Sequence, residues 1–472
     1  MQGIFAGAEV VRIVVPTDGA PAAALAQTSQ LLEREAAELE VELGAPVRLG
    51  PSEDDAQPRL ELRIDPSIGT PQATLDDAGA VLVVAGGDLE RTVEAFSLLR
   101  TLRCGGQRHV EARPTTSLVA AIARLEREVA WTYPAFGLRD IDWPRLCARS
   151  RGAVDPRDPL PGLQRWIARL GDAHTRVRSP TPIGHVPYTA RTVGDTIRFM
   201  QVPADSPAAA AGVRTGDELL DVDVADLWAR TGAPAHLRPW NVGRIALAGC
   251  AGEPRHYRVR RADGTVTSFT EVPGATRAGP PVVTSTRGRT GYLRVATWQP
   301  GINESIDGAL EELAACHRLV VDLRGNGGGS LIEASMFRDR FLDRPRQLGT
   351  IRYSTGDGGL SEPTPILGEP SPRSRWSRRT RFLTDALTYS ASEDAILGLR
   401  QLDHIDTCGS PSGGGSGRAR EIRLLEDIDL HVSTALTYDH DGHCIEGAGI
   451  PVDLPVELPP DQDAWTVVDD RW

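Results

Sequence analysis

Ser390, at a predicted corner between a strand and a helix, is one residue of this sequence that could carry out covalent chemistry. The run 382–389 leads into Ser390-Ala-Ser-Glu393, and a helical pattern follows. Hydrolases place a nucleophilic serine at such a strand-to-helix corner, where the amino end of the helix stabilises developing negative charge. The same residues also fit a capping box, in which Ser390 caps the helix and Glu393 bonds back to it. Both interpretations stay open at this point.

A glycine-rich loop is the second feature that could do chemistry. The apolar run 318–323 is typical of a buried strand, and Arg324-Gly-Asn-Gly-Gly-Gly-Ser330 and a helical pattern follow it. Backbone N–H groups at such a junction bind anions. A dinucleotide-binding loop would need Gly or Ala where Ser330 stands, and a phosphate-binding loop would need a lysine. An oxyanion hole remains, beside a tight turn used only for packing.

The basic residues of the chain restrict the chemistry further. All 52 of them are arginine, and the 472 residues include no lysine. Schiff-base chemistry, a phosphate-loop lysine and a serine–lysine dyad are therefore excluded. Arginine does not replace lysine as a general base, because it stays protonated in proteins. A nucleophilic Ser390 would need another base, which leaves histidine as the candidate.

Two histidine neighbourhoods have a chemical context. His174 lies in Leu170-Gly-Asp-Ala-His-Thr-Arg-Val177, just before a β-rich region. His440 and His443 lie close to Asp441 and Cys444, a spacing that could hold a metal, but no second ligand pair is evident elsewhere. We therefore expect no metal and no cofactor.

The β-rich region closely resembles bacterial PDZ domains in one signature. It contains Ser206-Pro-Ala-Ala-Ala-Ala-Gly212 and then Gly216-Asp217. In those domains Ser-Pro-Ala opens a short helix, the first glycine ends it, and Gly-Asp turns into the next strand. The resemblance implies a module that binds a peptide along a sheet edge, or a β-rich spacer that no longer does so.

Four signatures in one order resemble the C-terminal processing and tricorn-type serine peptidases, whose ClpP/crotonase-like catalytic region contains a PDZ-like domain. Gly171-Asp-Ala-His-Thr175 is similar to the family element Asp-Gly-His-Thr, with Ala173 at the usual glycine, and the PDZ signature follows it. Asp322-Leu-Arg-Gly-Asn-Gly-Gly-Gly329 and Ser390-Ala-Ser-Glu393 complete the set. The resemblance covers about residues 115–460.

The family has two branches that differ in their base. In the Ser–Lys branch the lysine lies in a segment similar to Cys408-Gly-Ser-Pro-Ser-Gly-Gly-Gly-Ser416, and here Gly415 stands at its position. The tricorn-type branch uses Ser, His and Glu. Its glutamate segment is similar to Glu446-Gly-Ala-Gly-Ile-Pro-Val-Asp453, with the proline shifted by one position.

The resemblance to the tricorn-type branch therefore implies three catalytic side chains. Ser390 would be the nucleophile, His174 the general base and then acid, and Glu446 the group that orients the imidazole and stabilises the imidazolium. It also implies oxyanion donors, which would be the backbone N–H groups of Ala391 and of Gly327 or Gly328.

The strands and helices expected from the sequence indicate an α/β protein with several domains, which must position these residues. We expect strands near 10–15, 60–64 and 81–84 and helices near 25–43 and 88–102. The expected units are an accessory α/β domain (1–112), a helical segment that carries His174 (113–179), a PDZ-like domain (180–278), a ClpP/crotonase-like core (279–460) and a tail (461–472).

Charge and composition indicate which partners to expect. The net charge of −12 and the pI of about 5.4 argue against a nucleic acid or an anionic membrane as a partner. No run approaches the roughly 18 apolar residues of a membrane span, and no signal peptide is visible. Six scattered cysteines fit reduced thiols, so we expect a cytoplasmic protein. The oligomeric state is left open.

The function we expect is that of a serine endopeptidase that cleaves peptides or C-terminal segments of proteins. A peptidase dedicated to one biosynthetic precursor peptide fits the same residues. A non-catalytic peptide-binding adaptor is the alternative from another class, and the intact Ser390, His174 and Glu446 argue against it.

Overall fold

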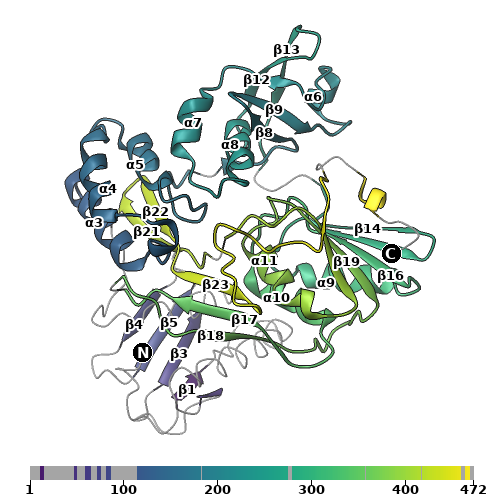
Figure 1. Cartoon of the computed structure of the whole chain (residues 1–472). Helices are drawn as coiled ribbons and strands as arrows, with labels where there is room; N and C mark the ends of the chain where they lie inside the picture. The colour runs from purple at the N-terminus through teal and green to yellow at the C-terminus, as the bar shows by residue number, and fades with distance from the viewer. Residues whose placement is uncertain are drawn as a thin grey trace.

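A computed structural model describes the parts of the chain discussed below. They are residues 11–14, 47–49, 59–64, 72–75, 81–86, 114–181, 183–274, 279–356, 358–415, 417–458 and 463–467. Figure 1 shows a mixed α/β molecule with several separate sheets. Among these residues no helix has both the length and the apolar character that crossing a membrane would need.

The N-terminal sheet has five strands in the order β2-β1-β3-β5-β4. They are β1 (Val11–Val14), β2 (Val47–Leu49), β3 (Arg59–Ile64), β4 (Gln72–Leu75) and β5 (Val81–Gly86). Only β4 runs antiparallel to its neighbour. The three predicted strands are confirmed as β1, β3 and β5. The helices predicted near 25–43 and 88–102 lie outside the described residues.

Three helices follow and pack on a small sheet. The helices are α3 (Leu118–Thr132), α4 (Trp143–Ser150) and α5 (Pro159–Ala168). The sheet has the order β21-β22-β6 and consists of β6 (Arg176–Arg178), β21 (Arg420–Leu425) and β22 (Ile428–Val432). Leu125 and Val129 of α3 are fully buried against this sheet, as their helical spacing predicts. Because β6 pairs with β22, the segment after His174 is joined to a region about 250 residues later.

A second five-stranded sheet has the order β13-β12-β10-β9-β8 and lies apart from the others at the top of Figure 1. Its strands are β8 (Thr189–Val193), β9 (Thr196–Gln201), β10 (Glu218–Leu219), β12 (Arg255–Arg260) and β13 (Val266–Glu271). Its helices are α6 (Pro207–Ala210), α7 (Val224–Arg230) and α8 (Arg238–Leu247). A small pair, β7 (Ile183–Gly184) and β11 (Gly249–Cys250), lies beside it.

The local structure expected around the Ser-Pro-Ala and Gly-Asp residues is confirmed. The Ser206 hydroxyl accepts a hydrogen bond from Ala209 N at 3.2 Å and so caps α6. Gly212 adopts a φ of 79° just after the helix, and Gly216 adopts a φ of 93° two residues before β10. These left-handed conformations favour glycine, which explains why the pattern is readable from sequence.

The largest sheet has six strands in the order β14-β15-β16-β19-β20-β24. They are β14 (Val282–Arg287), β15 (Thr290–Val295), β16 (Arg318–Asp322), β19 (Arg379–Thr384), β20 (Ile405–Gly409) and β24 (Leu454–Pro455). All neighbours from β15 to β24 run parallel. The associated helices are α9 (Ile302–Glu312), α10 (Leu331–Arg338) and α11 (Ala391–Ile396).

The parallel pairing of β16 and β19 determines where the chemistry lies. The glycine-rich loop follows β16, and the turn to Ser390 follows β19, so both leave the same edge of the sheet. Ligands bind at the carboxyl ends of the strands in open α/β sheets. An adjoining three-stranded sheet has the order β18-β17-β23 and contains β17 (Arg346–Tyr353), β18 (Thr364–Gly368) and β23 (Ala435–Asp439).

Candidate active site

Ser390 lies at a sharp corner between β19 and α11. Its backbone has φ 59° and ψ −126°, and non-glycine residues rarely adopt a positive φ. Strain of this kind occurs where a strand-to-helix turn presents a nucleophile. The Oγ of Ser390 lies 2.9 Å from Nε2 of His174, although the residues are 216 positions apart. The structure thus brings together two side chains that were predicted separately.

The capping interaction is present at the same corner. The Oε2 of Glu393 accepts a hydrogen bond from the Ser390 backbone N–H at 3.0 Å, which is the Glu393 half of a capping box, and the Glu393 N–H donates to the Ser390 carbonyl oxygen at 2.7 Å. The Ser390 hydroxyl also contacts His174. The capping interpretation and the nucleophile interpretation are therefore compatible, because the cap holds the corner while the hydroxyl reaches the imidazole.

Glu393 connects this corner to a second glycine loop, formed by residues 412–415 and Gly417. The carboxyl group is fully buried. Its Oε1 accepts hydrogen bonds from Ser412 Oγ at 2.6 Å and Gly414 N at 2.8 Å, and its Oε2 accepts one from Gly415 N at 2.8 Å. Burial raises the pKa of Glu393 to about 7, and the hydrogen bonds offset this only in part.

The first glycine loop, residues 324–330, lies against the corner. A Cβ atom at Gly328 would lie 2.8 Å from the Cβ of Ser390, and Gly328 has a φ of 103°. Both the close approach and the positive φ require glycine at this position. The loop therefore lies directly beside Ser390.

The predicted oxyanion donors differ in their present partners. The N–H of Gly328 donates to Oδ1 of Asn326 at 3.0 Å, so it is already engaged. In the described part of the chain, the N–H groups of Gly327 and Ala391 donate to no protein acceptor. Of the three predicted donors, Gly327 and Ala391 are therefore the ones whose N–H groups have no protein acceptor in the described residues; Gly327 is exposed and Ala391 is buried.

The loop that presents His174, residues 171–175, is held by a buried carboxylate. Asp172 is 1% exposed, and its Oδ1 accepts a hydrogen bond from the His174 backbone N–H at 2.8 Å. Its Oδ2 accepts hydrogen bonds from the hydroxyls of Thr175 and Ser433, each at 2.6 Å. Ser433 directly follows β22, so the loop is fixed to the C-terminal half of the chain.

Electrostatics keep the imidazole of His174 neutral near neutral pH. Burial lowers the pKa of His174 to about 4, Asp172 opposes that shift, and Arg176 and Arg418 add to it. A neutral imidazole is the form that accepts a proton as a general base. Burial alone would raise the pKa of Asp172, but His174 and the two hydroxyl hydrogen bonds bring it below its usual value.

The second ring nitrogen of His174 contacts a tyrosine. The hydroxyl oxygen of Tyr389 lies 2.9 Å from Nδ1 of His174, and the two rings stack with centroids 4.6 Å apart. A Cβ atom at Gly415 would overlap the Tyr389 ring. The ring of Tyr389 therefore occupies the space next to Gly415, the position at which the Ser–Lys branch has its lysine.

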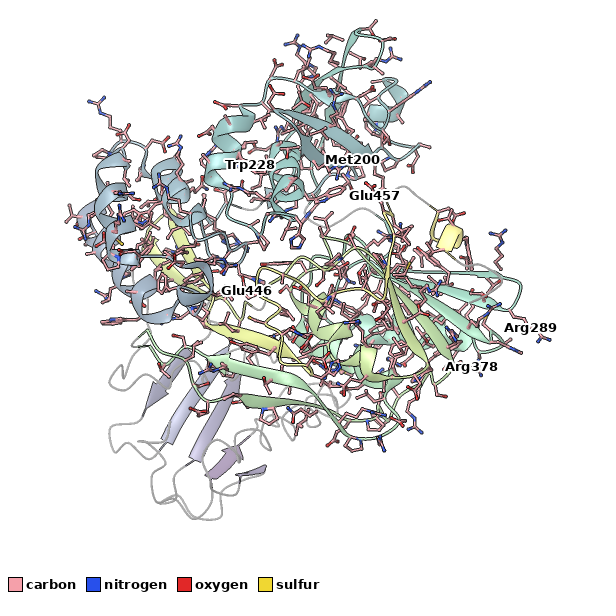
Figure 2. The ribbon with its side chains drawn as sticks, viewed as in Figure 1. Met200, Trp228, Arg289, Arg378, Glu446 and Glu457 are labelled. Carbon is pink, nitrogen blue, oxygen red and sulfur yellow. The ribbon has the colours of Figure 1, made fainter. Side chains whose placement is uncertain are left out.

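Glu446, the predicted partner of His174, forms a buried ion pair. It is 5% exposed, and its Oε1 accepts a hydrogen bond from Nη2 of Arg139 at 2.7 Å. Arg139 also donates to the carbonyl oxygen of Gly171 at 3.4 Å. In Figure 2 Glu446 lies where the helices α3–α5 approach the strands of the core. Because Tyr389 takes the Nδ1 position, the support of His174 by Glu446 stays a prediction.

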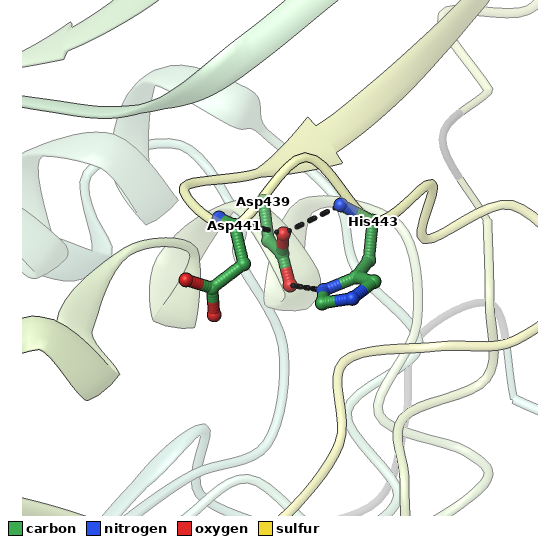
Figure 3. A group of neighbouring side chains, drawn as sticks. All are labelled: Asp439, Asp441 and His443. Atoms are coloured by element: carbon green, nitrogen blue, oxygen red, sulfur yellow. Dashed lines mark hydrogen bonds and ion pairs between the residues drawn. The ribbon is translucent and has the colours of Figure 1, made fainter.

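The residues whose spacing in the sequence could hold a metal lie in the turn after β23. Asp439, Asp441 and His443 each offer one ligand atom within 4.8 Å of the others (Figure 3). Oδ1 of Asp439 accepts the backbone N–H groups of Asp441 and His443 at 3.0 and 2.8 Å. His440 contacts Asp441 instead, at 3.3 Å. Tight turns form such contacts without an ion, and the expectation that no metal is used stays a prediction.

Two residues at His174 were missed by sequence reasoning, although both adjoin predicted ones. Asp172 lies inside the motif that contains His174, and Tyr389 directly precedes Ser390. One signal for Tyr389 was available. A Cβ atom at Gly413 or Gly415 would meet the ring of Tyr389, and one at Gly417 would meet the ring of His174, so this glycine-rich run indicates rings packed against it.

Comparison with known proteins gives a family match for part of the chain. Residues 289–456 match the family model described as Peptidase family S41. This range includes Ser390 and Glu446, whereas His174 precedes it. The chain is also 25% identical over 269 residues to the carboxy-terminal-processing protease of Bartonella bacilliformis. That match covers 54% of this chain and 57% of the relative, so it spans little more than half of the relative's length.

Solved structures share the fold. Mature CPAF complexed with lactacystin is similar with a TM-score of 0.55 and 16% identity, over 72% of this chain and 94% of that chain. The photosystem II D1 C-terminal processing protease is similar with a TM-score of 0.51 and 18% identity, over 73% of this chain and 94% of that chain. At these identities the similarity concerns the fold alone.

Proposed function

We propose that this protein is a serine endopeptidase that cleaves peptides or C-terminal segments of proteins. The match of residues 289–456 to the model of peptidase family S41 supports this proposal. One observation carries the proposal. The Oγ of Ser390 lies 2.9 Å from Nε2 of His174, at a corner where Ser390 has a positive φ. A hydroxyl in contact with a neutral imidazole is the pair that acyl transfer requires.

The proposed reaction uses this pair twice. The Oγ of Ser390 attacks the scissile carbonyl carbon while Nε2 of His174 takes the hydroxyl proton. His174 then gives that proton to the leaving amine, and an acyl-enzyme remains. A water molecule attacks the acyl-enzyme with His174 again as base, which releases the carboxylic acid and restores Ser390.

The negative charge of each tetrahedral intermediate needs hydrogen-bond donors. We assign that role to the N–H groups of Ala391 and Gly327, because neither has a protein acceptor among the described residues. Ala391 is also the first residue of α11, where the amino end of a helix favours negative charge. Loss of one such donor costs about 10²–10³ in rate in a comparable enzyme.

Glu446 keeps its proposed place as the acidic member of the site, but with an indirect route to His174. Its carboxylate pairs with Arg139, and Arg139 also holds the carbonyl of Gly171, three residues before His174. The same carboxylate contributes to the raised pKa of Tyr389, which contacts His174. We propose that Glu446 orients the base loop, residues 171–175, through Arg139 and Tyr389.

We also retain the predicted domain organisation as part of the proposal. Its units are the accessory domain (1–112), the helical segment (113–179), the PDZ-like domain (180–278), the ClpP/crotonase-like core (279–460) and the tail (461–472). The capped helix α6 and the glycine turns around it support a PDZ-like unit. The parallel strands β15, β16, β19 and β20 support the proposed core.

The adaptor alternative requires a sheet edge that is open to a peptide. In the proposed PDZ-like unit β8 is an edge strand, and α8 packs directly on it. A Cβ atom at Gly243 of α8 would overlap the carbonyl of Ala190 in β8, so the two backbones are in contact. An incoming strand would have to displace α8 to pair with β8, so an adaptor would have to use the other edge of the sheet, at β13.

The proposal is tested with a fluorophosphonate probe and peptide substrates. We expect the probe to label Ser390, and we expect Ser390→Ala or His174→Ala to lower kcat by about 10⁶, as in a well-studied serine protease. Asp441→Asn is a suitable control, because this exposed side chain lies in the turn after β23. Peptide binding by a wild-type protein that is neither labelled nor active would support the adaptor instead.

A further inference from the structure

We propose that Tyr389 is a positioning residue that fixes the tautomer and the orientation of His174. This inference rests on the proposed function, because it concerns the base of that reaction. The inference is based on a pair of contacts with His174 that the roles predicted for Ser390, His174 and Glu446 do not explain. Two consecutive residues, Tyr389 and Ser390, contact the two nitrogens of one imidazole, each at 2.9 Å.

The corner at Ser390 makes this double contact feasible. Side chains of consecutive residues in an extended strand point to opposite faces. The positive φ of Ser390 turns the chain at this point, and both side chains reach the same ring. The rings of Tyr389 and His174 lie nearly parallel, with 25° between their planes. The strained backbone therefore places the hydroxyl of Ser390 and the phenol of Tyr389 on the same imidazole.

The second glycine loop packs closely against the stacked rings of Tyr389 and His174. A Cβ atom at Gly413 would lie 2.7 Å from Cδ2 of Tyr389, and one at Gly415 would overlap the phenol. A Cβ atom at Gly417 would lie 2.6 Å from Nδ1 of His174. The N–H groups of Gly414 and Gly415 donate to Glu393, which fixes this surface to the nucleophile corner. Tyr389 is therefore held in a slot that side chains larger than glycine would close.

The chemistry of the base defines what Tyr389 does in this slot. For Nε2 of His174 to accept the Ser390 proton, the neutral ring must carry its proton on Nδ1. The oxygen of Tyr389 lies 2.9 Å from Nδ1, and we assign it the role of acceptor for that Nδ1–H. A phenol can also donate its own proton to Nδ1, and the tautomer measurement below distinguishes the two arrangements. The opposite tautomer would place a proton on Nε2 and block the transfer from Ser390.

An uncharged phenol suits this task in a buried site. Burial raises the pKa of Tyr389 far above its ordinary value, and the charges of Asp172 and Glu446 add to the effect. Tyr389 thus orients the ring without bringing a charge, while Asp172 supplies negative charge to the imidazolium through space. The usual third member of a serine triad combines both tasks in one carboxylate, and here they are divided between two residues.

The first experiment measures the tautomer without any turnover. Nitrogen-15 NMR of the full chain labelled at histidine reports which ring nitrogen is protonated, and the His174→Ala spectrum identifies the signal. We expect Nδ1 of His174 to be protonated in the wild type and a shift toward protonated Nε2 in Tyr389→Phe. Tyr257→Phe is the matched control, because it also removes a buried hydroxyl, which donates to Leu247 O at 2.7 Å far from His174.

The second experiment separates orientation from substrate binding. We expect Tyr389→Phe to lower kcat by about 10- to 100-fold, the effect of one hydrogen bond to a group that becomes charged, with KM nearly unchanged. Gly415→Ala should have a similar effect, because its Cβ displaces the phenol. Gly308→Ala is the control for this substitution, since nothing lies within 4 Å of a Cβ there.

The outcomes distinguish this inference from the proposed function. A wild-type His174 protonated on Nε2, or a Tyr389→Phe variant with an unchanged tautomer and an unchanged kcat, would overturn the role of Tyr389 and leave the peptidase proposal intact. Failure of the wild type to react with the fluorophosphonate would overturn the peptidase proposal, while the NMR result would still decide what Tyr389 does to His174.

Discussion

Two regions meet at the imidazole of His174, and they are built in different ways. The nucleophile corner, residues 385–393, combines bonds within itself, such as Glu393 to Ser390, with bonds to other parts of the chain. Apart from those to His174, these reach at most 94 positions away, as from Trp298 to Ser392. The base loop, residues 171–175, depends on contacts with residues that are more than 250 positions away in sequence, as Ser433 is from Asp172. Both regions contain a local motif, but the base loop is also fixed to residues much farther away in sequence than the other partners of the corner.

This difference implies different ways to fail. A substitution in the nucleophile corner should lower activity while the protein remains folded, because most partners of the corner lie within one part of the chain, residues 298–415. A substitution in the base loop should lower activity and stability together, because the same contacts join distant parts of the chain. Each prediction below tests one side of this contrast.

The largest effect is expected at Gly328, on the side of the nucleophile corner. In Gly328→Ala the new Cβ would lie 2.8 Å from the Cβ of Ser390 and would also oppose a φ of 103°. A displacement of about 1 Å in a reacting group costs about 10²-fold in rate, so we expect kcat/KM to fall by about 10²–10³-fold. The strained φ should also cost about 1–3 kcal/mol of stability, but the protein should stay folded at the assay temperature. A loss of folding equal to the loss of activity would contradict the local character of this corner.

A large but mixed effect is expected for Asp172→Asn in the base loop. The substitution removes a buried charge that accepts three hydrogen bonds, from His174, Thr175 and Ser433. Such bonds to charged groups are worth roughly 1.5–3 kcal/mol each, so stability should fall by about 3 kcal/mol. The rate should fall by about 10- to 100-fold. Denaturant unfolding and kcat/KM measured on the same samples would check that both losses occur together.

An intermediate effect is expected where Glu446 reaches the base loop through Arg139. Glu446→Gln and Arg139→Gln should each lower kcat/KM by roughly tenfold, because a buried ion pair that loses one partner is destabilised. If Glu446 acts through Arg139, the double variant should be little worse than either single one. Independent, multiplying losses would show that Glu446 reaches His174 by another route, and an unchanged Glu446→Gln would remove it from the site.

The same contrast explains what sequence reasoning could provide. Ser390, the capping role of Glu393 and the first glycine loop are predictable because their roles depend on local backbone geometry, which constrains residue type position by position. The strands β1, β3 and β5 were predictable from apolar runs. Glu446 was placed by resemblance alone, and its pairing with Arg139 follows from how α3–α5 pack, which no local pattern encodes. Tyr389 was missed because its role depends on a contact with His174, which lies 216 positions before Ser390 in the sequence.

The smallest effect should appear in the pH dependence, which connects the two regions through Glu393. Burial holds the pKa of His174 at about 4 and raises that of Glu393 to about 7. Below pH 7 Glu393 takes up a proton and loses one of its four hydrogen bonds, which changes how it holds the corner and the second glycine loop. We therefore expect the rate of Ser390 labelling to fall several-fold as the pH drops through about 7, and to fall tenfold per unit only below about 4, where His174 becomes protonated.

Stability should respond to the same two groups with opposite signs. The pKa of Glu393 is raised above its ordinary 4.5, so the folded state binds more protons, and this contribution is lost as the pH rises toward 7. The pKa of His174 is lowered from 6.5, so its contribution is lost as the pH falls from 6.5 toward 4. Glu393→Gln should remove the shallow step in labelling near pH 7 and leave the steep one near 4. A shallow step that persists in this variant would mean that another group links the nucleophile corner to the base loop.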